Sequence, residues 1–125
     1  MKKKNNKSMS KKYDKYQSPL AERYAGEEMS YNFSDQLKYS TWRRLWIALA
    51  ETEKALGVKA ISQKQINEMK KFQDDINFDA ARKHEIRVKH DVMAHVHAFS
   101  DQCPAASPII HLGATSAFVQ DNADL

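Results

Sequence analysis

A helical spacing of three and four residues runs from Ser34 to Gly57. The repeating positions are Trp42, Leu45, Trp46, Leu49, Thr52, Glu53 and Leu56. Such spacing places side chains on one face of an α-helix. Ser34 is suited to the N-cap, Asp35 to the first turn, and Gly57 to a left-handed residue after the last turn. We predict one helix here, with the two tryptophans packed in the core rather than exposed as a stacking platform for bases.

Two further helices follow the same pattern. Ser62 and Gln65 match a capping box, and the helix after them would bury Ile66, Met69 and Phe72. The polar break at residues 74–77 is followed by a third helix. Either Asn77 or Asp79 can cap this helix, which runs through Ala80 and Ala81. No segment alternates between apolar and polar residues, so the sequence predicts an all-α fold.

Lys89, His90 and Asp91 interrupt the apolar pattern of this third segment. One possibility is a helix that passes unbroken to Phe99. The other is a new helix, capped by Asp91, whose inner face is Val92, Val96 and Phe99. We favour the second, because it puts His90 at a helix N-terminus. His95 and His97, two residues apart on that helix, point in different directions and are interpreted as structural.

Pro104 and Pro108 end the pattern, and a last helix is predicted from about Ala117. Before it, Gly113 permits close approach of the backbone, and Thr115 and Ser116 place hydroxyls beside the unpaired N–H groups of the helix start. This combination suits a carboxylate or a phosphate, although either residue would serve equally as a simple N-cap. Together with the His90 junction, it suggests an anion held between two helix ends.

Charge is unevenly distributed along the 125 residues. The chain has a formal net charge of +4, but residues 1–15 hold seven of the 20 basic and one of the 16 acidic residues, which leaves the remainder at −2. We expect this Lys-rich tail to be disordered and to act as a solubilising extension, with a nuclear-import or RNA-contacting arm as the alternative. It lacks the apolar region of a signal peptide, and the apolar run Leu45 to Ala50 is too short to cross a membrane. Nucleic acid and membranes are therefore not expected partners.

Cysteine and histidine usage argues against a metal centre. Cys103 is the single cysteine, which excludes an internal disulfide, fits a reducing compartment such as the cytosol, and is interpreted as a small buried thiol. His84 and His90 are six residues apart, whereas the helical zinc motif needs four. We expect no metal and no cofactor.

Four separated motifs carry a resemblance to a known family. They are Arg23-Tyr24 after Ser18-Pro19-Leu20, Trp42-Arg43-Arg44-Leu45-Trp46, Lys89-His90-Asp91-Val92-Met93-Ala94-His95, and Ile109-Ile110-His111-Leu112-Gly113-Ala114-Thr115-Ser116. In this order they resemble the animal-type adenylosuccinate lyases of the fumarase/aspartase superfamily. The resemblance begins at about Tyr16 and covers about the N-terminal quarter of a family chain. It implies a helical N-terminal lyase domain over residues 16–112, and over residues 113–125 the start of a helix leading to a central bundle that is largely absent.

The resemblance also implies an activity. Members of the family are carbon–nitrogen lyases of purine nucleotide and AMP biosynthesis. They release fumarate by β-elimination from adenylosuccinate and from succinylaminoimidazole-carboxamide ribotide. They are cytoplasmic homotetramers whose active sites draw on three subunits, and the small-molecule substrate is a succinylated purine nucleotide. A non-catalytic helical module or short isoform that docks on full-length subunits is the alternative.

The resemblance also implies which residues form the site, by their positions in the four motifs. Arg23 and Tyr24 would hold the nucleotide phosphate, although from the residues alone they are equally a solvated charge and a rim aromatic. The resemblance further assigns a substrate-binding triplet to Lys89, His90 and Asp91, the succinyl carboxylate to Thr115 and Ser116, and support of the second loop to His111.

Two features of the resemblance limit what the chain is expected to do alone. Lys89 replaces the more usual Arg, which keeps the charge but loses the bidentate geometry. The general acid and base of the family lie outside this chain, which leaves His90 as an auxiliary proton carrier. We therefore expect the chain alone not to turn over substrate.

Overall fold

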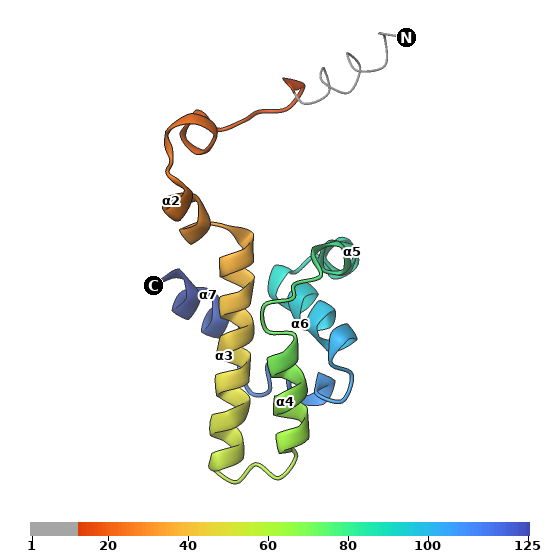
Figure 1. Cartoon of the computed structure of the whole chain (residues 1–125). Helices are drawn as coiled ribbons and strands as arrows, with labels where there is room; N and C mark the ends of the chain where they lie inside the picture. Colours follow the sequence, from red (N-terminus) through yellow and green to blue (C-terminus); the bar gives the residue numbers. More distant parts are fainter. Residues whose placement is uncertain (1–12) are drawn as a thin grey trace. The chain divides into compact units, whose positions relative to one another are not determined.

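The computed structural model describes residues 13–125, and all the regular structure in this range is helical (Figure 1). The predicted disordered tail lies, for residues 1–12, outside the described range. The chain divides into one unit that ends at Phe33 and a second unit from Ser34 to Leu125. The all-α prediction is confirmed for the described residues, and the domain boundaries expected at residues 15 and 112 stay predictions.

The N-terminal unit contains two short elements. The first, η1 (Leu20–Tyr24), is one π-helical turn closed by a bond of 2.7 Å from the Ala25 N–H to the Leu20 carbonyl. The second is α2 (Glu27–Asn32), whose N-cap is Gly26. Neither element has a buried residue.

The second unit begins with α3 (Asp35–Ala55), the longest helix. Ser34 caps it as predicted, because its hydroxyl accepts from the Leu37 N–H at 3.2 Å. Gly57 has a φ of +96°, the left-handed geometry expected after the last turn. Leu56, the last residue of the predicted helical spacing, lies just after the helix, which ends at Ala55, and is 81% exposed.

The next helices also begin at the residues that the sequence indicates. The capping box of Ser62 and Gln65 opens α4 (Gln63–Lys71), and the Asn77 side chain, rather than Asp79, caps α5 (Phe78–Val88). The part of the chain that the structure describes holds no helix long and apolar enough to cross a membrane.

The helix is interrupted at His90, as predicted by the interpretation that places a new helix after this residue. Lys89 ends α5 with a left-handed φ of 53°, and α6 (Asp91–Gln102) follows. The residue that caps α6 is His90 rather than Asp91, because the His90 ring accepts from the Met93 N–H. A 3-10 turn, η2 (Ser107–Ile109), and the final α7 (Ser116–Asp124) complete the unit.

The core forms where α3 packs against its neighbours. In Figure 1, α3 lies between α7 and α4, and it contacts both, while α5 packs on α6. The largest fully buried apolar side chains come from α3, α4, α6, the η2 segment and α7. They are Trp42, Trp46, Ile66, Met69, Val92, Phe99, Cys103, Ile109 and Val119. The two tryptophans are thus core anchors, as predicted.

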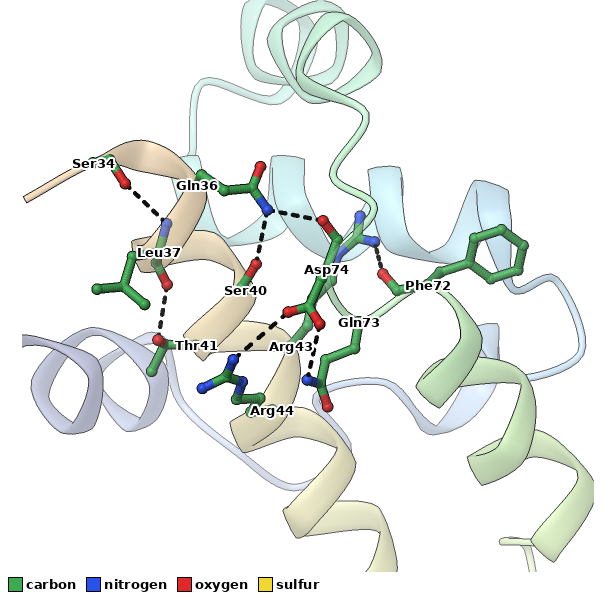
Figure 2. A network of polar contacts seen from close by, with 10 residues as sticks. All are labelled: Ser34, Gln36, Leu37, Ser40, Thr41, Arg43, Arg44, Phe72, Gln73 and Asp74. Atoms are coloured by element: carbon green, nitrogen blue, oxygen red, sulfur yellow. Dashed lines mark hydrogen bonds and ion pairs between the residues drawn. The ribbon is translucent and has the colours of Figure 1, made fainter. Parts of the chain in front are cut away.

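A buried arginine fastens the loop between α4 and α5 to α3. Arg43 is 1% exposed, and its Nη1 donates to the Phe72 carbonyl and, at 3.0 Å, to the Asp75 carbonyl. Gln36 donates to the Asp74 carbonyl at 2.8 Å in the same network, which Figure 2 shows. Burial lowers the pKa of Arg43 to about 10, so the guanidinium stays charged at neutral pH.

Candidate functional site

Two of the predicted site segments meet in space. His90, at the α5–α6 junction, has its Nε2 3.3 Å from the hydroxyl of Ser116, the first residue of α7. One turn further along α7, Gln120 donates to the Asp91 carboxylate at 3.3 Å. The starts of α6 and α7 are therefore held together by His90 and Ser116, from the two predicted motifs, and by the pair of Asp91 and Gln120.

The triplet at the start of α6 has a definite geometry. The Nδ1 of His90 accepts from the Met93 N–H at 3.3 Å, and the Asp91 carboxylate accepts from the Val92 N–H at 2.8 Å. The contact of 3.7 Å between the His90 Nδ1 and the Asp91 Oδ1 is too long for a hydrogen bond. Lys89 is exposed, and among the described residues it forms no ion pair. Its ammonium group can therefore interact with a ligand.

The hydroxyls at the start of α7 do not serve the helix. Thr115 occupies the N-cap position with a φ of −94° and a ψ of 166°, but its side chain makes no capping hydrogen bond. The Ser116 hydroxyl contacts His90 instead. The simple N-cap interpretation therefore does not describe these two residues, and the hydroxyls adjoin N–H groups at the positive end of a helix.

Gly113 has a left-handed backbone, with a φ of +72°. A side-chain carbon at this position would meet no atom of the described residues within 4 Å. The left-handed backbone by itself favours glycine here, and close approach of a ligand to this backbone stays a prediction.

His111 lies in the turn before α7 and also has a left-handed backbone, with a φ of 65°. Its Nδ1 accepts from the indole N–H of Trp46 at 2.9 Å. Burial lowers the pKa of His111, and the nearby His90 lowers it further. The neutral ring thus joins the buried face of α3 to the segment that carries Thr115 and Ser116.

The remaining predicted site residues, Arg23 and Tyr24, lie on η1 in the N-terminal unit, where both are exposed. Their assignment to the nucleotide stays a prediction.

His95 and His97 have structural surroundings, in agreement with the sequence interpretation. His95 is buried and stacks on Tyr39, with ring centroids 3.6 Å apart. Burial, and to a lesser degree the charge of Arg43, lowers the pKa of His95 to about 4, so the ring is neutral at physiological pH. The ring of His97 stacks on that of His84 at 5.2 Å.

The thiol of Cys103 is also in a structural position. Cys103 is fully buried, and burial raises its pKa to about 11. Over residues 13–125, no group of three or more potential metal ligands comes together.

Sequence reasoning missed two residues that contact the site. Gln120 is four residues after Ser116 and therefore shares its helical face, a signal that could have found it. Trp46 was assigned to packing alone. A helical repeat indicates that an indole is buried, but it does not indicate whether a hydrogen-bond acceptor lies near the indole N–H.

Comparison with known proteins identifies relatives of the chain. No family model matches it. An adenylosuccinate lyase of Schistosoma mansoni is 54% identical over 113 residues, which are 90% of this chain and 23% of the relative. The Saccharomyces cerevisiae adenylosuccinate lyase is 52% identical over 115 residues, and a bacterial one, from Staphylococcus saprophyticus, is 32% identical over 106 residues. The chain spans about a quarter of the length of these relatives. Over the matched residues, it belongs to the adenylosuccinate lyase family.

Proposed function

We propose that the protein acts in the β-elimination of fumarate from adenylosuccinate and from succinylaminoimidazole-carboxamide ribotide, and that it supplies one part of the active site. The observation that carries this proposal is the contact of His90 with Ser116, which joins two family motifs at adjacent helix starts. The names of the relatives support the reaction class.

The chemistry of the site fits a succinyl carboxylate. Removal of a proton beside a carboxylate builds up negative charge on that group. Hydroxyls and N–H groups at the start of a helix stabilise such charge, which is the role we assign to Thr115 and Ser116. Lys89 adds a positive charge, and His90 orients the Ser116 hydroxyl. Arg23 and Tyr24 are assigned to the nucleotide phosphate.

The rest of the machinery is assigned to other parts of the complete enzyme. In this proposal, the general acid and base come from residues outside the 125, and active sites form in a cytoplasmic homotetramer. The purified chain alone should therefore leave adenylosuccinate unchanged, as measured by its absorbance.

A chimera tests the proposal directly. This chain replaces the matched segment of the Saccharomyces cerevisiae relative, and the release of fumarate is measured. We expect an active chimera, and a rate reduced on the order of a hundredfold by Ser116→Ala, because one donor to a developing anion is lost. Ser107→Ala, which removes an exposed hydroxyl in η2, is the matched control and should leave the rate unchanged.

Two results would contradict the proposal. One is a chimera that assembles and unfolds like its parent but releases no fumarate. The other is a Ser116→Ala chimera as fast as the Ser107→Ala control.

A further inference from the structure

We propose that Trp46 is a positioning residue, whose indole N–H fixes His111 as the neutral tautomer with its proton on Nε2. The ring then offers an Nε2–H donor in the turn before α7, near enough to His90 for the two rings to interact electrostatically. This inference rests on the proposed function only in so far as the ligand is an anion.

The tautomer follows from the chemistry of the donor. An indole N–H donates and cannot accept, so at 2.9 Å the Nδ1 of His111 must accept. In a neutral ring the proton is then on Nε2. Protonation of Nδ1 would point two N–H groups at each other across this distance. Trp46 is 1% exposed, so water does not compete for the contact.

His90 is fixed in the same way by another group that only donates. The backbone N–H of Met93 is directed at its Nδ1, so the neutral His90 also carries its proton on Nε2. At 3.3 Å, this N–H donates to the Ser116 hydroxyl oxygen. The hydroxyl proton of Ser116 is then free to donate to a ligand.

In the proposed site, the groups offered to the ligand are all donors. They are the Nε2–H of His111, the O–H of Ser116, and the ammonium group of Lys89, which precedes His90 in the sequence. Such a set matches a carboxylate or a phosphate, which only accept, and it disfavours a cation. Trp46 contributes to this selectivity although it is buried in the core.

The chain contains its own control for Trp46. Trp42 lies one turn earlier on α3 and is 0% exposed, and within residues 13–125 its Nε1 has no hydrogen-bond partner. Trp46→Phe and Trp42→Phe therefore remove the same N–H group and the same ring from equally buried positions. Of the two variants, only Trp46→Phe removes a donor to His111.

The test is an NMR experiment on the full chain with ¹⁵N-labelled histidine. In the wild type we expect His111 to carry its proton on Nε2, and Trp46→Phe to give a mixture of both tautomers. The same variant should raise the pKa of His111, because a hydrogen bond to the neutral form is lost. The groups that face His111 in this titration are Trp46, from α3, and His90, from the α5–α6 junction. Trp42→Phe should change neither property.

A second measurement applies if the variants do not fold. A scalar coupling across the bond from the Trp46 Nε1–H to the His111 Nδ1 should be visible in the wild type. Absence of this coupling, a wild-type proton on Nδ1, or an unchanged tautomer in a folded Trp46→Phe variant would overturn the inference. Failure of the proposed function has another signature: an inactive chimera beside a wild-type chain whose His111 tautomer is as expected.

Discussion

The Arg43 network and the contact between His90 and Ser116 both join separate helical segments through polar side chains, but they differ in burial. Arg43 is almost fully buried, and the partners of its guanidinium are backbone carbonyls of the α4–α5 loop. The His90 side chain is 45% exposed, and Ser116 is half-buried. The Arg43 cluster is therefore covered by other parts of the protein, whereas the cluster of His90 and Ser116 is accessible from solvent.

This difference separates a polar cluster that holds the fold from one suited to a ligand. Carbonyls buried beside a charge depend on that charge for their hydrogen bonds, so its loss is costly. Donors at an accessible helix start are hydrated when empty and can exchange water for an anion. We therefore expect substitutions in the first cluster to reduce stability, and substitutions in the second to reduce function more than stability.

The largest effect on stability is expected from Arg43→Leu. The variant leaves the Phe72 and Asp75 carbonyls without their donor, and we expect the free energy of unfolding to fall by about 3 kcal/mol. Urea unfolding of the wild type and the variant measures this change.

The neighbouring arginine provides the control. Arg44 is exposed, and its ion pair with Asp74 is long, at 3.8 Å. Arg44→Leu should change the free energy of unfolding by no more than about 0.5 kcal/mol. Equal losses in the two variants would contradict the assignment of the network to Arg43.

A smaller loss of stability is expected when the pH is lowered, because His95 is buried in its neutral form. Its pKa is lowered from 6.5 to about 4 in the folded state, so the unfolded chain binds a proton that the folded chain excludes between these values. The stability is therefore present above about pH 6.5 and is lost as the pH falls toward about 4. Between about pH 7 and about pH 4.5, we expect this residue to account for a loss of about 2 kcal/mol in the free energy of unfolding.

His95→Phe isolates this contribution from other groups that titrate in the same range. Phenylalanine keeps a flat ring against Tyr39 but cannot take up a proton. The variant should lose less stability than the wild type over the same pH interval. Parallel pH profiles for the two proteins would show that His95 is not the group responsible.

The starts of α3, α4 and α5 could be predicted from the sequence, because each depends on local chemistry. Ser34, Ser62 and Asn77 cap α3, α4 and α5 through residues only three positions away. The break at His90 followed from the same reasoning, although the capping group was expected to be Asp91. Local hydrogen bonds leave a local pattern, so one sequence is enough to find them.

The long-range contacts could not be predicted in this way. Arg43 reaches carbonyls 29 and 32 residues away, and carbonyls are present at every position, so no residue type marks the partner. Trp46 and His111 are 65 residues apart, and their contact depends on how α3 packs beside the turn before α7. For the pair of His90 and Ser116, the motifs suggested a shared site because both had anion-binding chemistry, and the structure places them in contact.

Of the three residues expected to contribute to stability, His90 should have the smallest effect, and its variants test most directly whether its cluster serves a ligand or the fold. His90→Ala removes the cap of α6 and should lower the free energy of unfolding by about 1 kcal/mol. His90→Asn should recover most of this loss, because asparagine is a favoured N-cap residue. Asparagine is shorter, however, and cannot at the same time cap the helix and donate to Ser116 as the Nε2–H does. In the chimera with the Saccharomyces cerevisiae relative, both variants should therefore be slower than the parent, even though only His90→Ala is destabilised. Urea unfolding together with the rate of fumarate release checks this, and an asparagine variant that regains both stability and the full rate would show that His90 serves the helix alone.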